Sequence, residues 1–514
     1  MNAPWSAAVP ATAGGAGVRA SPDFIGRRPA RPVRSAAPCP RARERGSVLI
    51  IVLWITFGLV SLALYFAGSM SFEQRAADQR VARVQAETAI EGMVRYLTYL
   101  LSNQITNGSN GITLEVSAYP NAAVPIGDCR VWLISRDTNL VTTGPGKIAF
   151  GLLDESSRLN LNTVTSNQMM WLPTMTVDLA NGILDWRSTN GPGTTLSYYA
   201  TMQPPYFCKN DPFETVDELR LVYGADMDAL IGEDYNRNGI LDPTETDANQ
   251  NNMLDPGVLE YFTVYSNEPA ATGAVNLASV SYEALYGVLS TNLSASRAAE
   301  ICSRLGLSPT GGATTGGRGG GTGGTGRGGT GRGSTSGGGR SGGATTTTTT
   351  ASFTSPLQFY IRSGLTSTEF SQVATNFSMG TTNVQGRVNV NSAGEVVLTC
   401  LLNGDDAGAQ TLISYRQNNP NNLTSIAWVA DALQGNTQDL DALAAGDYIT
   451  VSTYQYTADI AALGPHGRGY RRIKFVFDTS SGSVRILYRQ DLTHLGWALG
   501  EDVRKNYVLA DNPK

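Results

Sequence analysis

Residues Val48 to Phe66, VLIIVLWITFGLVSLALYF, decide how this chain of 514 residues is organised. The stretch contains no charged side chain, and as an α-helix rising about 1.5 Å per residue it would span roughly 30 Å of hydrocarbon. We therefore expect a transmembrane helix. A secretory signal peptide is the alternative, but the apolar run is too long for one and no small-x-small cleavage site closes it.

The charges on either side of this segment predict its orientation. Residues 1–46 contain eight arginines and carry a local charge of +6, so the rest of the chain carries −11. Arginines before a membrane helix favour a cytoplasmic N-terminus, and we expect the bulk of the chain on the other side of the membrane. The acidic remainder disfavours binding to a nucleic-acid backbone.

The helical pattern continues beyond the membrane segment. Residues 72–101 contain no proline and only one glycine, Gly92. Apolar residues recur near helical spacing at Ala77, Val81, Val84, Ile90, Met93, Leu97, Leu100 and Leu101. We expect a stem helix that follows the membrane helix directly.

The residues before the apolar segment carry a processing pattern. Arg43-Glu-Arg-Gly46 stands directly before Ser47. This arrangement resembles the class III signal of type IV prepilins and type II secretion pseudopilins, which a membrane peptidase cuts after the glycine on the cytoplasmic side. The resemblance implies a processing site between Gly46 and Ser47. An unrelated single-pass anchor stays open as the alternative.

One position departs from the common pilin pattern. The fifth residue after the expected cut is Ile51, where most members of the family have Glu. That Glu is thought to neutralise the terminal amine of a neighbouring subunit, because an unpaired charge in the membrane is costly. Within the family, the subunit without it is typically the large minor pseudopilin called protein K, placed at the filament tip.

Motifs in the exported part also resemble protein K. They are D-E-S-x-x-L-N-L-N-T at 154–163, Ile183-Leu-Asp-Trp-Arg187, Tyr198-Tyr199, Pro205-Tyr206, Lys209-Asn210, Pro212-Phe213-Glu214, Val216-Asp-Glu-Leu219 and Phe262-Thr-Val-Tyr265. The resemblance implies a structural subunit, not an enzyme, at the inner membrane with its bulk in the periplasm. It also implies four kinds of partner: other minor pseudopilins, the major pseudopilin, the prepilin peptidase and the inner-membrane assembly platform.

The implied fold class is α+β. A pilin-like long N-terminal transmembrane helix would pack on a small antiparallel sheet, with inserted helical modules of the helix-hairpin-helix or SAM-like kind. From the residues we predict strands at Cys129–Ser135 and 148–153, and a β-hairpin of Arg472–Asp478 with Ser483–Arg489. The expected divisions are a leader 1–46, membrane helix 47–71, stem 72–105, first strands 106–158, helical modules 159–310, Gly/Thr-rich linker 311–350, a second helical module 351–460 and the hairpin region 461–514.

An internal repeat runs through the helical modules. Asn160 and Arg187 lie 27 residues apart, as do Asn389 and Arg416, and both pairs begin in an L/V-N-L/V-N-T/S context. A partial third copy runs from 275 to 304. Each copy predicts a strand, an Asn-containing turn capping a helix, and a second helix ending in Arg. A DNA-binding subunit of a competence pilus is the alternative, but the copies lack the Gly-rich hairpin with basic neighbours that grips phosphate.

One segment has the pattern of a calcium loop. It offers oxygen donors at positions 1, 3, 5, 7, 9 and 12 of twelve and Gly239 at position 6. Ca²⁺ takes six to eight hard oxygen ligands, and glycine takes the tight turn. The predicted ligands are Asp234, Asn236, Asn238, Ile240 through its carbonyl, Asp242 and Glu245.

A second and weaker loop begins 13 residues after the first. Its ligands would be Asp247, Asn249, Asn251, Met253 and Asp255, with Asn252 in the glycine place and Val258 where Glu belongs. The second loop could share ligands with the first, and Glu260 is a nearby carboxylate. A turn-rich polar surface is the alternative for both loops, and a calcium-dependent adhesion module is a further alternative function.

No pattern of catalytic residues stands out. The chain has two histidines, His466 and His494, neither beside a nucleophile or metal motif. Four cysteines of the exported part lie in an oxidising compartment and could pair, in an order that the sequence leaves open: Cys129, Cys208, Cys302 and Cys400.

Overall fold

The computed structural model describes residues 47–136, 147–189, 195–270, 274–309, 350–380 and 382–509. The predicted leader, with Gly46, lies outside them, as does the predicted linker apart from its last residue. Contacts divide the chain into two compact units, residues 1–72 and residues 73–514.

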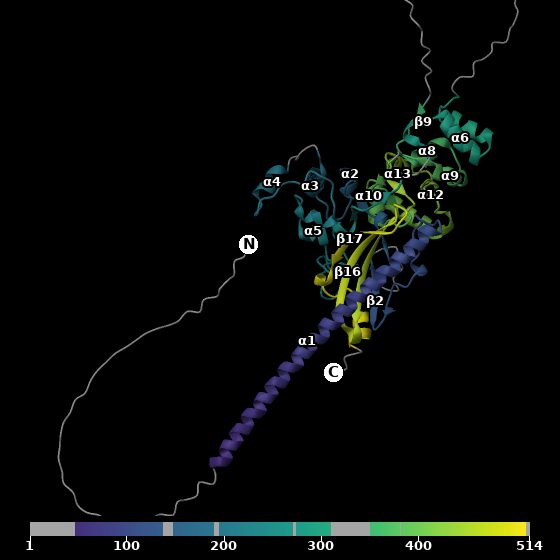
Figure 1. Cartoon of the computed structure of the whole chain (residues 1–514). Coiled ribbons are helices and arrows are strands. Elements are labelled where there is room, and N and C mark those ends of the chain that lie inside the picture. Colours follow the sequence, from purple (N-terminus) through teal and green to yellow (C-terminus); the bar gives the residue numbers. More distant parts are fainter. Residues whose placement is uncertain are drawn as a thin grey trace, which may run out of the picture. The chain divides into compact units, whose positions relative to one another are not determined.

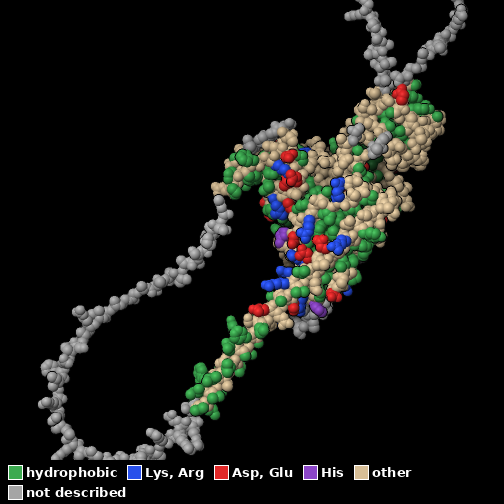
Figure 2. Space-filling view, viewed as in Figure 1, with side chains coloured by type: hydrophobic (Ala, Val, Ile, Leu, Met, Phe, Trp, Pro, Cys, Tyr) green, Lys and Arg blue, Asp and Glu red, His purple; other side chains and the backbone are tan. Residues whose placement is uncertain are grey.

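A single helix, α1 (Ser47–Thr106), belongs to both units. In the first unit its apolar side chains are exposed, as the green atoms at the N-terminal part of α1 show in Figure 2. Within the described residues, α1 is the one helix long and apolar enough to cross a membrane. The predicted membrane segment is therefore helical and continues without a break into the predicted stem.

The second unit is built on an antiparallel sheet with the strand order β1-β2-β15-β16-β17. These strands are β1 (Val124–Ile126), β2 (Cys129–Ser135), β15 (Gln455–Gly464), β16 (Arg468–Asp478) and β17 (Arg485–Asp491). Three of them, β2, β16 and β17, are labelled in Figure 1. The predicted hairpin is formed by β16 and β17, which pair antiparallel. The strand β15 runs across position 460, where one division was expected to end.

The predicted strand at 148–153 is wrong in its extent. The segment forms two short strands, β3 (Ala149–Phe150) and β4 (Leu153–Asp154), which pair with β2 and β15 respectively. The break occurs because the chain passes at Gly151 from one neighbour strand to the other. The 3₁₀ turn η2 (Glu155–Ser157) follows β4 directly.

The sheet packs against the part of α1 that follows Phe72. Ile90, Met93 and Leu97 of α1 are buried against one face of the sheet together with Phe475 and Phe477 of β16. Alternate residues of a strand point to opposite faces, so a register that buries both phenylalanines turns Lys474 away from the stem. The predicted α+β fold, with a pilin-like helix packed on a sheet, is confirmed.

The helical modules are inserted between β4 and β15. The first contains β5 (Leu159–Asn160), α2 (Ser166–Met169), α3 (Val177–Arg187), α4 (Leu196–Thr201), η3 (Val216–Leu221), α5 (Met227–Ile231), η4 (Val258–Glu260), β6 (Phe262–Thr263) and β7 (Asn267–Glu268). The second contains β8 (Val275–Asn276), η5 (Leu277–Ser279), β9 (Val280–Ser281), α6 (Tyr282–Asn292), α7 (Ala295–Arg304), β10 (Thr350–Ala351), α8 (Pro356–Ser363), α9 (Ser367–Val373) and β11 (Phe377–Ser378). The third contains β12 (Val384–Gln385), β13 (Val388–Asn389), α10 (Glu395–Leu401), α11 (Asp406–Asn418), α12 (Ala427–Ala432), α13 (Thr437–Ala444) and β14 (Ile449–Thr450).

The sequence repeat corresponds to a repeated hydrogen-bond pattern. Asn160 and Asn389 each accept, through Oδ1, a hydrogen bond from the backbone N–H two residues later, at 2.9 and 3.0 Å. Arg187 and Arg416 each donate to two backbone carbonyls of the same turn. All three modules are closed by a parallel pair of two-residue strands: β5 with β6, β8 with β11 and β13 with β14.

The role predicted for the repeated asparagines as helix caps needs correction. Thr165 caps α2, and the N-cap residue of α10 is Gly394, which has no side chain to cap the helix. Asn276 caps only the short turn η5. Each asparagine turns the chain by accepting a hydrogen bond from the backbone N–H two residues later. This arrangement is an Asx turn, which asparagine favours outside helices.

A segment after the hairpin covers the opposite face of the sheet. It contains η9 (Thr493–Leu495), α14 (Gly500–Val503) and the π-helical turn η10 (Arg504–Leu509). Tyr507 packs edge-on against Trp132 of β2, with ring centroids 5.4 Å apart. The sequence prediction did not anticipate this cover.

The four described cysteines, all of which follow α1, are free in the structure. Each is buried in a core, and burial raises the pKa of all four thiols. The predicted possibility that they pair with one another is therefore not realised here. These thiols act as small apolar side chains.

A candidate calcium centre

The first predicted calcium loop follows α5 and folds around the carboxylate of Asp234. Its Oδ1 accepts the backbone N–H of Asn238 at 2.9 Å, and its Oδ2 accepts that of Gly239 at 2.8 Å. Gly239 has a backbone φ of +80°, a conformation that residues with a Cβ rarely adopt. The glycine at position 6 is therefore needed for the turn that brings later residues back toward Asp234.

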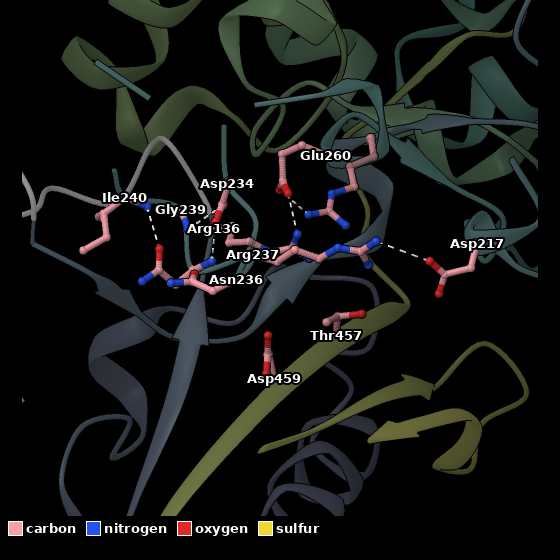
Figure 3. Close-up of polar contacts among 12 residues, drawn as sticks. Arg136, Asp217, Asp234, Asn236, Arg237, Gly239, Ile240, Glu260, Thr457 and Asp459 are labelled. Carbon is pink, nitrogen blue, oxygen red and sulfur yellow. Dashed lines mark hydrogen bonds and ion pairs between the residues drawn. The ribbon is translucent and has the colours of Figure 1, made fainter. Parts of the chain in front are cut away.

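The other predicted ligands are linked to one another by hydrogen bonds. The amides of Asn236 and Asn238 both donate to Oδ2 of Asp242, at 2.6 and 2.9 Å. Glu245 closes the loop, since its two carboxylate oxygens accept the backbone N–H groups of Asn236 and Asp242 at 3.1 and 3.0 Å. Ile240 donates its N–H to Asn238 at 3.0 Å (Figure 3).

This group of oxygens has the character of a cation site. Burial raises the pKa of Asp234 and of Glu245, and repulsion from Asp234 and Asp242 raises that of Glu245 further. The buried Oδ1 of Asn236 has no hydrogen-bond partner among the described residues. Carboxylate, amide and carbonyl oxygens are the ligands that Ca²⁺ takes, so these residues fit the ion. Among the described residues, no three His, Cys, Asp or Glu side chains, those of Asp234, Asp242 and Glu245 included, lie placed to hold a metal ion by themselves.

The loop is anchored on the sheet. Arg472 of β16 is fully buried and forms a two-bond ion pair with Asp459 of β15, at 2.9 and 2.6 Å. The same guanidinium donates to the backbone carbonyls of Asn236 and Arg237. Asn236 also donates to the carbonyl of Trp497 at 3.3 Å. The loop is therefore held between the sheet and the C-terminal segment.

The second loop repeats the geometry with more exposed side chains. Asp247 accepts the backbone N–H groups of Asn251 and Asn252, at 3.2 and 2.8 Å, as Asp234 does in the first loop. Asn252 takes the place of glycine with φ of +58°, which asparagine tolerates better than most residues. Asn249 and Asn251 both donate to Asp255, at 2.5 and 3.2 Å, and the N–H of Met253 donates to Asn251 at 2.7 Å.

A residue from outside the second loop occupies the place of its missing glutamate. The carboxylate of Glu233 accepts the backbone N–H groups of Ala248 and Asp255, at 2.7 and 3.1 Å. Glu245 binds the first loop in a closely similar way, whereas Val258 is buried in the core. Sequence reasoning missed Glu233 because it precedes the loop that it completes, so no linear pattern contains it.

The carboxylate that the sequence suggested as a spare ligand has another role. Glu260 accepts bonds from Arg136 and Arg158, both at 2.5 Å. Its two oxygens are occupied by these guanidinium groups. Glu260 belongs to a charged cluster beside the first loop (Figure 3).

The remaining predicted site residues are not brought together with this centre. Ser47 is the first residue of α1, and Gly46 lies outside the described residues. His466, with φ of 56°, lies in the turn after β15, and His494 lies in η9; both are exposed.

Comparison with known proteins gives a weak similarity to a solved structure. No family model matches the chain, and no curated protein matches it. Among solved structures, a chain of the GspK-GspI-GspJ complex from the type 2 secretion system of enterotoxigenic Escherichia coli matches with a TM-score of 0.33 and 9% sequence identity. The match covers 82% of this chain and 99% of that chain. The chain thus has a weak structural similarity to a component of a type II secretion complex.

Proposed function

We propose that this chain is a structural minor pseudopilin of a type II secretion system, anchored in the inner membrane and placed at the tip of a periplasmic pseudopilus. One observation carries the proposal: α1 begins as an apolar span and continues into the core of an antiparallel sheet. A helix of this kind can sit in the membrane before assembly and among neighbouring stems afterwards. The leader pattern that ends at Gly46 supports the same conclusion.

The inserted modules and Ile51 support the place at the tip. Three helical modules make the exported part much wider than a single stem helix. Copies stacked along a filament would clash, which favours one copy at an end. Ile51 cannot neutralise the terminal amine of a neighbour in the membrane, so this subunit suits an end position.

Calcium is a structural ion in this proposal. One Ca²⁺ would be held by Asp234, Asn236, Asn238, Asp242 and Glu245. A second would be held by the loop that begins at Asp247, with Glu233 as its closing carboxylate. Both ions would fix the segment between α5 and η4 onto the sheet, and neither has a part in a reaction.

The repeat geometry supports a packing role for the helical modules. In two copies, the arginine in the last turn of the second helix donates to carbonyls inside its own module. Guanidinium groups used in this way do not face a phosphate backbone.

Chemical crosslinking in membranes, followed by affinity capture of the full chain, tests this function. We expect the chain to be captured with smaller pseudopilins in a fixed, low stoichiometry. Gold labelling through an epitope in residues 311–350 should mark one end of each filament. Labels distributed along the filaments would contradict the tip position, and capture without any pseudopilin would contradict the function.

A further inference from the structure

The segment that covers the sheet after the hairpin rests on a small apolar core. We call this segment, residues 493–509 with η9, α14 and η10, the C-terminal strap. Within residues 493–508, only Ala498, Leu499 and Gly500 are fully buried. The core that the strap completes has six buried apolar residues, whereas the core between the stem and the sheet has nineteen. A segment with few buried apolar contacts opens at a low free energy, so the strap depends on its other contacts.

The first calcium loop supplies two of these contacts. The amide of Asn236 donates to the carbonyl of Trp497 at 3.3 Å. At the second contact, a Cβ added to Gly500 would lie 3.9 Å from Cδ1 of Ile240. An open cleft lies between the strap and the part of the loop that holds Glu245. The strap therefore meets the loop along a narrow line of contact that includes two of the predicted ligands.

One residue of the sheet joins this loop to the start of the strap. The buried guanidinium of Arg472 donates to the carbonyls of Asn236 and Arg237 in the loop. The backbone N–H of Arg472 donates to the hydroxyl of Thr493, the first residue of the strap, at 3.1 Å. A shift of the loop would leave a buried cation with fewer acceptors at the point where the strap begins, which is costly.

A cation determines how firmly the loop keeps its shape. Burial raises the pKa of Glu245, and repulsion from Asp234 and Asp242 raises it further. Without a cation, the three carboxylates repel one another at neutral pH and favour an open loop. Ca²⁺ would reverse this effect, because each carboxylate then faces two positive charges. The ion would thereby keep Asn236 in contact with Trp497.

We propose that Ca²⁺ in the first loop closes the C-terminal strap over the sheet, and that the strap opens when the ion leaves. Closure of the strap rests on the calcium centre of the proposed function and does not depend on the place of the chain in a filament. An open strap would expose a face of the sheet on which Trp132 and Leu463 are now buried. The ion would then control a surface beyond its own loop.

Hydrogen exchange followed by mass spectrometry tests the strap. The full chain in detergent is compared in chelator and at a Ca²⁺ concentration that just saturates the wild type. Peptides from residues 493–509 report on the strap, and peptides from α11 in the third module are the internal reference. We expect Ca²⁺ to slow exchange in the strap by roughly tenfold or more and to leave α11 nearly unchanged, because the ion acts on a local opening.

Two variants assign the effect to the first loop. Glu245→Gln removes a carboxylate of that loop and should abolish the effect of Ca²⁺ on the strap. Asp255→Asn is the matched control, because Asp255 is an exposed carboxylate of the second loop, and it should keep the effect. Wild-type exchange in α11 shows that each variant has folded.

Calcium titration calorimetry of the same samples separates the possible failures. If the wild type binds Ca²⁺ and the strap exchanges alike with and without it, closure of the strap is overturned while the calcium centre stands. An effect that persists in Glu245→Gln, or that slows α11 by the same factor as the strap, also overturns closure. If the wild type binds no Ca²⁺, the calcium centre is wrong and closure is wrong with it.

Discussion

At the scale of single residues, Glu233 is the most informative side chain, because it gives the second loop the carboxylate that its own sequence lacks. We predict that the wild-type chain binds two Ca²⁺ ions. Glu233→Gln should lower the Ca²⁺ affinity of one of the two sites by roughly tenfold or more, since an amide is a poorer ligand than a carboxylate. Calcium titration calorimetry of the full chain measures both affinities. Glu214→Gln, at a side chain 81% exposed, is the control. Two unchanged affinities in Glu233→Gln would refute this role.

Asp154 predicts a pH dependence of stability. It is buried and accepts bonds from Asn389, Ser392 and Thr453, and burial still raises its pKa from 3.8 to about 6. The folded state thus holds the proton more tightly than the unfolded state. Protonated Asp154 therefore adds about 3 kcal/mol to the free energy of unfolding well below pH 3.8. This contribution is lost as the pH rises through 6.

Denaturant unfolding of the full chain at several pH values tests Asp154. Between pH 4 and pH 7.5, the wild type should lose about 2.4 kcal/mol relative to Asp154→Asn, because the variant has no carboxyl group to titrate. Asp128→Asn, in an exposed turn, is the control for removing one carboxylate. If the free energies of unfolding of wild type and Asp154→Asn change with pH in parallel, Asp154 does not titrate as described.

At the scale of elements, the repeated unit of strand, turn and two helices is locked by one arginine. Arg416 is buried and donates to the carbonyls of Val390 and Ala393, at 3.0 and 2.7 Å. We predict that Arg416→Met lowers the free energy of unfolding by about 2–4 kcal/mol, because both carbonyls would stay buried without a donor. Denaturant unfolding measures this. Arg485→Met, at a side chain 59% exposed, should change stability by less than about 0.5 kcal/mol. Equal effects of the two changes would contradict the locking role.

The elements also show how far the sequence alone reaches. The stem, β2 and the hairpin follow from apolar periodicity, because each buries one regular face. The sequence predicted one strand where the structure has two, β3 and β4. The two are separate because β3 pairs with β2 and β4 pairs with β15, and a local pattern does not contain these distant partners. The contribution of Glu233 depends on how two loops fold back on each other, and the charged cluster at Glu260 on ion pairs between residues far apart in the sequence. Local patterns contain neither.

At the scale of the whole molecule, one helix serves two units of different character. Its apolar part has the composition of a membrane span, and its second part is an integral piece of the sheet's core. The inserted modules and the calcium loops belong to the second unit. This division is the one expected if the proposed function is correct, with the apolar part of α1 in the membrane before assembly.

The mass of the N-terminal peptide tests the central claim most directly. The chain is recovered from membranes of cells that contain or lack a prepilin peptidase, and the peptide is identified by mass spectrometry. A pseudopilin should begin at Ser47 when the peptidase is present and should keep residues 1–46 when it is lacking, and Gly46→Ala should block the cut. A chain that begins elsewhere, or has the same N-terminus in both strains, would contradict the assignment.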